Sequence, residues 1–163
     1  MPDMYPYIEW LQNTWVSILI RDTKWLFPAI EMVHLFGIVT LLGTTLALDL
    51  RLMDLWLRPR PVSLLMRRLL PWSWAAFVVM VCTGSGLFVS DPARFFYNTS
   101  FRIKMVLIVL AGLNAFLFQV TSFRSLEKWD LNASPPRGAK IAGFFSLVLW
   151  FSVVAAGRWI AFV

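Results

Sequence analysis

The sequence predicts an all-α integral membrane protein: a bundle of four membrane-spanning helices with an amphipathic N-terminal helix at the membrane interface. Hydrophobic residues make up 59% of the 163 residues and charged residues only 15%, against roughly 45–50% and about 25% in an ordinary soluble domain. The mean hydropathy is +0.69. A spanning helix needs roughly 20 mostly apolar residues, so four spans with short loops fill residues 1–163 as a single transmembrane domain.

The first predicted element is a helix over about residues 7–20 that lies along the membrane surface. Trp10 and Trp15 alternate there with Glu9 and Gln12, and Trp25 follows. Indole rings favour the headgroup zone, where one part of the ring is apolar and the other contacts water. This segment is therefore expected to lie at the interface and not to cross the bilayer.

Four predicted spans follow, over about residues 25–49, 71–90, 101–123 and 141–161. The first opens at Phe27-Pro28, because proline is tolerated in a first helical turn. Pro59 and Pro61 interrupt helix formation, so the residues from Arg51 to Leu70 are predicted to form a loop. Residues that can cap a helix precede the third span, and Pro135-Pro136 form a turn before the fourth.

Basic residues are concentrated in two of the predicted loops. The loop after the first span carries Arg51, Arg58, Arg60, Arg67 and Arg68, and the loop before the fourth carries Arg124, Lys128, Arg137 and Lys140. Cytoplasmic loops retain lysine and arginine, which predicts a plasma-membrane protein with both termini outside. The net charge of +6 then reflects topology and not a nucleic-acid partner. The expected partner is the lipid bilayer, and a homo-oligomer or a larger membrane complex stays open.

Titratable side chains within the first span are the main candidates for a functional site. At about 100° per residue, Glu31, His34, Thr45 and Asp49 fall within roughly 60° of one another, so one face of this helix is polar along its length. Charged groups inside a membrane are costly and indicate function by default. Glu31 and His34 are expected in the outer half, and Asp49 near the cytoplasmic end.

The other spans bring small and basic residues to the same outer layer. Gly84 and Gly86 would let a flat ligand or a neighbouring backbone approach closely, and Lys104 and Arg158 either bind anionic groups or extend to the membrane surface. His34 either hydrogen-bonds Glu31 one turn earlier or serves as a ligand. Near the cytoplasmic end, Asp49, Arg51 and Asp54 are expected to form an interfacial ion-pair cluster.

Two metal chemistries are open to His34. A copper(I) site needs soft ligands, but Met32 lies about 200° around the helix from His34, so these two side chains cannot share a site. Haem b needs one axial imidazole, an apolar slot and basic groups for its propionates. We expect His34 to supply the imidazole, with Glu31 orienting the ring.

Four motifs carry a resemblance over nearly the whole chain: Glu31-Met-Val-His-Leu-Phe-Gly37, Asp49-Leu-Arg-Leu-Met53, Thr83-Gly-Ser-Gly86 and Phe101-Arg-Ile-Lys104. With them the chain resembles a bacterial four-helix membrane family known only as a domain of unknown function. The layout is more remotely similar to HemJ-type protoporphyrinogen oxidases and CopD-type copper proteins. The HemJ resemblance implies that His34 and Lys104 serve haem and substrate. It also implies a second histidine in the third span, where this chain has Asn114 and Gln119.

The leading hypothesis is a haem-binding redox membrane protein, with porphyrinogen oxidation as its most specific version. The alternative is a non-enzymatic membrane subunit, or a small transport component for an ion or copper, that uses the polar face of the first span. In that alternative, Glu31 and Asp49 relay protons, although about 27 Å separates them at 1.5 Å per residue. Whether the protein is an enzyme stays open.

Overall fold

The regular secondary structure is all helical over the residues that the computed structural model describes, 5–121, 126, 129–130 and 134–162. Four helices are long and apolar enough to cross a membrane, which confirms the predicted fold class. These helices are α3 (Leu26–Leu52), α4 (Val62–Ser90), α6 (Thr99–Val120) and α7 (Arg137–Trp159). Three short helices, α1 (Tyr5–Gln12), α2 (Trp15–Asp22) and α5 (Pro92–Tyr97), complete the described part.

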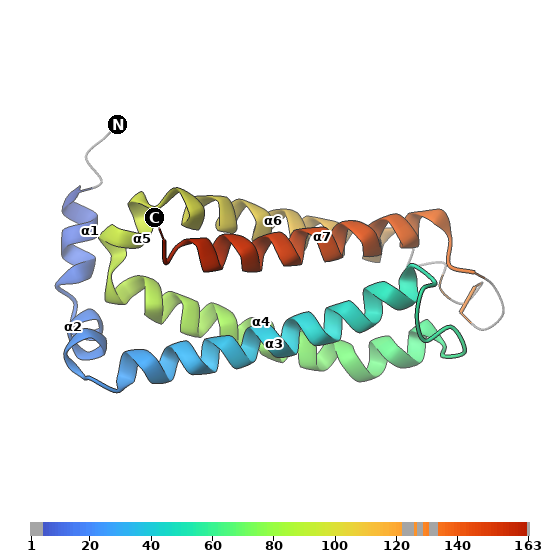
Figure 1. Ribbon diagram of the computed structural model, residues 1–163, viewed down its shortest axis with the longest axis horizontal. Coiled ribbons are helices and arrows are strands. Elements are labelled where there is room, and N and C mark those ends of the chain that lie inside the picture. The colour runs from blue at the N-terminus through green and yellow to red at the C-terminus, as the bar shows by residue number, and fades with distance from the viewer. Residues whose placement is uncertain (1–4, 122–125, 127–128, 131–133, 163) are drawn as a thin grey trace.

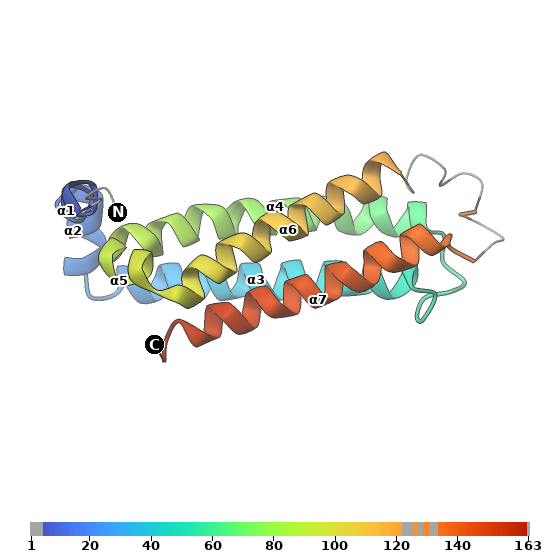
Figure 2. The same cartoon turned by 90° about the horizontal axis from the view of Figure 1, so that it is seen from above.

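The long helices form two layers of antiparallel pairs (Figure 1). One layer is α3 with α4 and the other is α6 with α7. The layers meet mainly where α3 packs against α7, whereas α4 and α6 are not among the closely packed pairs. The short helices α1, α2 and α5 gather at the end where α7 finishes, as the second view also shows (Figure 2). Four helices therefore surround the interior, and the two layers pack closely against each other along α3 and α7.

The predicted N-terminal helix over residues 7–20 is two helices, so its continuity was predicted wrongly. The chain breaks at Asn13 and Thr14, and the Thr14 hydroxyl oxygen accepts a hydrogen bond from the Ser17 backbone nitrogen at 3.4 Å. A threonine at this position satisfies a free amide at the start of a helix and so favours a new start. Both helices lie across the end of the bundle (Figure 1), with Trp10 and Trp15 exposed.

The helix that carries the second predicted span begins well before residue 71, at Val62. Arg67 and Arg68 therefore lie on α4 and not in a loop. Pro61 precedes the helix with a φ of −58°, which suits a helix start. Pro71 lies inside the helix, where its side chain is exposed and so does not disturb packing against α3. The turn that remains is held by Arg51, whose Nε donates to the Arg60 carbonyl at 2.8 Å.

The other span boundaries shift by a few residues. The first and fourth spans run from Leu26 to Leu52 and from Arg137 to Trp159, and the third ends at Val120. The last two residues predicted for the third span, together with Arg124 and Lys128, lie outside the described residues. At this end of the bundle a buried apolar cluster closes the interior, and it comprises Leu52, Val62, Phe118, Leu126, Trp129 and Ala139.

Candidate functional site

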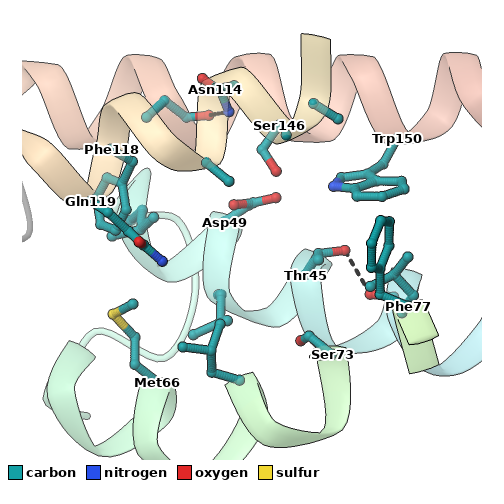
Figure 3. Close-up of a pocket in the computed structure, with 18 of the residues that line it drawn as sticks. Thr45, Asp49, Met66, Ser73, Phe77, Asn114, Phe118, Gln119, Ser146 and Trp150 are labelled. Atoms are coloured by element: carbon teal, nitrogen blue, oxygen red, sulfur yellow. Dashed lines mark hydrogen bonds between the residues drawn. The ribbon is translucent and has the colours of Figure 1, made fainter. Parts of the chain in front are cut away.

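The bundle interior contains two cavities that share Leu41 and Trp150 in their walls. The first, of about 340 Å³, is lined by residues of α3 to α7 that include Glu31, His34, Gly84, Lys104 and Arg158; we call it the His34 cavity. The second, of about 220 Å³, contains Asp49 and lies toward the basic loops; we call it the Asp49 cavity (Figure 3). The polar face of α3 thus lines both cavities in succession.

His34 is buried and held in one orientation by α4. Its Nδ1 lies 2.8 Å from the Thr83 hydroxyl oxygen. The Thr83 hydroxyl donates its own proton to the Val79 carbonyl at 2.7 Å, so the oxygen must accept from His34. The proton of a neutral imidazole then resides on Nδ1, and the lone pair on Nε2 is available for a ligand.

Gly84 allows this close approach of α3 and α4. A Cβ atom placed there would lie 3.3 Å from Cε1 of His34, tighter than ordinary van der Waals contact. Gly86 has a different environment, because a Cβ atom there would meet Ile30 and Ile20 at 3.8 Å and beyond. Gly86 does not line the His34 cavity, so the structure brings together the other five predicted site residues and leaves this glycine outside.

The predicted hydrogen bond between Glu31 and His34 is not formed. The partner of His34 is Thr83, and Glu31 lines the same cavity with its side chain exposed. The role expected of Glu31, fixing the orientation of the imidazole, is therefore taken by Thr83. The sequence held a signal for this residue, since it opens the Thr83-Gly-Ser-Gly86 motif, but spacing within one helix favoured Glu31.

Basic side chains face the His34 cavity from α5, α6 and α7. Lys104 is half-buried, close enough to interact electrostatically with His34, and packs along Gly157 of α7. Among the described residues no hydrogen-bond or ion-pair partner of Lys104 is found. Arg158 lies at the rim with its guanidinium 5.2 Å from the centre of the Phe162 ring, and Arg94 also lines the cavity. The cavity therefore combines an apolar wall with an excess of positive charge.

Asp49 does not belong to the predicted ion-pair cluster. Arg51 pairs with Asp54 at 3.9 Å, and Asp54 pairs with Arg58 at 3.8 Å. Asp49 is two positions from Arg51, about 200° around the helix, so the two side chains point in opposite directions. Asp49 instead lies in the bundle interior, 6% exposed, and its Oδ2 has no hydrogen-bond partner among the described residues.

The described residues contain no group of three or more His, Cys, Asp and Glu side chains that could hold a metal ion. Met32 and Cys82 are exposed, as expected for side chains outside a shared copper site. Met80 does line the His34 cavity. Among the described residues that line this cavity, His34 is the only histidine, and its Nε2 is open to a ligand.

These features define the class of protein: a multi-pass α-helical membrane protein with a polar, one-histidine cavity between its spans. The chain belongs to the family of unknown function DUF6644, which matches residues 7–163. This match and the four apolar helices confirm the resemblance to an uncharacterised membrane family, whereas the likeness to HemJ-type and CopD-type proteins stays a prediction. Comparison with curated proteins and with solved structures found no match.

Proposed function

We propose that the protein binds haem b in the His34 cavity and acts as a redox protein of the membrane. The proposal rests on two side chains that line the same largely apolar cavity, each with a polar group that has no partner among the described residues there. The Nε2 lone pair of His34 is free of the Thr83 hydrogen bond, and the Lys104 ammonium has no counter-ion among the described residues. An uncompensated cation within a membrane span is costly, so an anionic ligand would stabilise it.

The residues present fit this cofactor. His34 would supply the axial nitrogen, and Thr83 would hold the ring as the outer partner that metal-bound histidines require. Lys104 and Arg158 would pair with the two propionates. The remaining wall is largely apolar, with Leu35, Ile38, Leu87, Phe88 and Val153 among its members, which excludes water from the porphyrin faces. Bound haem would supply one-electron transfer.

Porphyrinogen oxidation is the finer version of the proposal and rests on the resemblance to HemJ-type enzymes. A porphyrinogen carries carboxylates like those of haem, so Lys104 and Arg158 suit either molecule. Arg94 adds a third cation at the same cavity. Glu31 lines the same cavity, so the three cations together balance two propionates and this carboxylate.

The proposed orientation in a bacterial inner membrane places the His34 cavity on the outer side. The described arginines and lysines of the turn after α3 and of the start of α7 lie at the opposite end of the bundle (Figure 1), and the positive-inside rule assigns such an end to the cytoplasm. Single cysteines at Arg58 or Trp10, introduced into a Cys82→Ser background, test this. A membrane-impermeant maleimide should label the Trp10 position and not the Arg58 position in intact cells.

The spectrum of the purified protein tests the haem proposal. From cells well supplied with haem, we expect a Soret band that shifts when dithionite is added, at near-stoichiometric haem. His34→Ala should lose the band, and exogenous imidazole should restore it by entering the vacated position. Met32→Ala, on the exposed side of the same helix, is the matched control. Protein absorbance alone, or full haem occupancy in His34→Ala, would contradict the proposal and favour the subunit or transport alternative.

A further inference from the structure

The carboxylate of Asp49 is a buried charge that the haem proposal does not use. It is 6% exposed, and its Oδ2 has no hydrogen-bond partner among the described residues. A buried, unpaired carboxylate costs several kcal/mol relative to water. Some group must therefore neutralise it, and that group is absent from the residues around it.

The polar neighbours of Asp49 are already engaged elsewhere. Thr45 donates to the Leu41 carbonyl at 2.8 Å, and the Asn114 amide donates to the Ala142 carbonyl at 3.0 Å. Only Ser146 of α7 points toward the carboxylate (Figure 3). The uncharged polar residues Ser73 and Gln119 complete the polar part of the lining.

No basic side chain lines this cavity among the described residues. The nearest arginine in the chain, Arg51, is committed to the Arg60 carbonyl and to Asp54. Asp49 is the only charged group of the lining, so the negative charge is met either by a proton on the carboxylate or by a cation that enters from outside.

The rest of the cavity wall selects the kind of cation. Aromatic rings of Trp74, Phe77, Phe118 and Trp150 line it, with Phe77 and Trp150 beside each other on one side of Asp49 (Figure 3). Sites for Ca²⁺ and Mg²⁺ are built mainly on carboxylates, and Asp49 is the only carboxylate among the described residues of this wall. Aromatic faces with one carboxylate are instead the surroundings that attract an organic ammonium group.

Space and access also suit such a ligand. The α6 part of the wall includes the small residues Ala111, Gly112 and Ala115, and a side chain added at Gly112 would meet nothing within 4 Å. Both α4 and α6 line the cavity, yet they are not a closely packed pair. A molecule that partitions into the bilayer can therefore approach between these helices.

We propose that the Asp49 cavity binds a small apolar organic cation, an amine or quaternary ammonium. Its ammonium group pairs with Asp49 and its apolar part lies among Trp74, Phe77 and Trp150. Because Asp49 is the only titratable group among the described residues of the wall, a proton and the cation compete for the same carboxylate.

Calorimetry on the full-length protein in mild detergent tests the proposal with benzyltrimethylammonium as the probe. Neopentylbenzene, in which a tert-butyl group replaces the trimethylammonium, is the neutral control of the same shape. We expect Asp49→Asn to weaken binding of the cation by about tenfold or more, as for loss of a charged hydrogen-bond partner, and to leave the neutral control unchanged. The cation should bind the wild type more weakly as the pH falls.

Two results would overturn the proposal: equal affinity of the cation for wild type and Asp49→Asn, or equal affinity of the wild type for the cation and its neutral analogue. If Asp49→Asn does not fold, Gly112→Leu replaces it. That substitution fills open space without touching the carboxylate, and it should abolish binding of both probes. Retained cation binding in Gly112→Leu would also reject the site.

Discussion

The two cavities of this bundle lie along one face of α3 and carry opposite charge. His34 and Asp49 are separated by about 22 Å along the helix at 1.5 Å per residue. Around His34 the neighbouring helices supply lysine and arginine, whereas around Asp49 they supply aromatic, small and uncharged polar residues. The polar face of α3 therefore lines two cavities that suit ligands of opposite charge. The helices that pack around α3, and not α3 itself, determine this difference.

The pair of helices that packs most closely is also different at the two sites. At His34 the close approach is between α3 and α4, with Gly84 against the imidazole. At Asp49 it is between α3 and α7, where a Cβ atom at Gly143 would lie 3.0 Å from the Asp49 carbonyl oxygen. Each site is thus held by a different helix pair, which predicts that they can be altered separately.

The largest expected effects come from substituting one residue in each cavity and measuring the binding of both ligands to each variant. His34→Ala should abolish haem binding and leave benzyltrimethylammonium affinity within about twofold, and Asp49→Asn should do the reverse, because substitutions at residues that lie far apart and do not contact each other behave additively. Haem content from the Soret band and cation affinity from calorimetry measure the two effects. If either variant lost both ligands while remaining folded, the cavities would be one coupled site.

Thr83→Val should weaken haem binding by roughly 10- to 100-fold, as for other outer partners of metal-bound histidines. The substitution keeps the shape of the side chain but removes the oxygen that accepts from His34 Nδ1. Titration of haem into the apoprotein measures the affinity. Thr45→Val, in the other cavity, is the matched control and should not change it, since the Thr45 hydroxyl bonds only to backbone carbonyls of its own helix.

Gly143→Val should destabilise the fold by roughly 1–3 kcal/mol, the usual range for overpacking. The new side chain would press on the Asp49 carbonyl and on Leu52, which lie within 3.3 Å of the added Cβ atom. Gly112→Val adds the same atoms in open space and should change stability by about 0.5 kcal/mol or less. Thermal unfolding in detergent compares the two variants, and equal midpoints would mean that α3 and α7 do not pack closely here.

Lys104→Met should give the smallest effect, a loss of about fivefold in haem affinity, equivalent to about 1 kcal/mol for a partly solvated ion pair. Methionine keeps the apolar stem that packs along Gly157, so the cavity wall is retained. Lys104→Arg should restore most of the affinity. An unchanged affinity in Lys104→Met would show that this lysine does not contact the propionates.

Much of the His34 cavity could be predicted from the sequence, because helical periodicity fixes which residues share a face. Glu31 and His34 share the cavity for that reason, and spans of similar length carry Gly84, Lys104 and Arg158 to the same depth. The hydrogen bond from His34 to Thr83 could not be predicted, since it joins residues 49 positions apart on different helices. Gly86 does not line the cavity, because Ile30 of α3 and Ile20 of α2 lie beside it.

The sequence by itself determined that this protein is a bundle of four spanning helices, because long apolar runs in lipid must satisfy their backbone groups within helices. Periodicity also determined the polar face of α3. Only the tertiary structure decided that Asp49 is unpaired inside the bundle, that Thr83 and not Glu31 holds His34, and that α4 starts at Val62. These outcomes depend on which helices come into contact, and contact between distant segments is set by side-chain packing that no local pattern encodes.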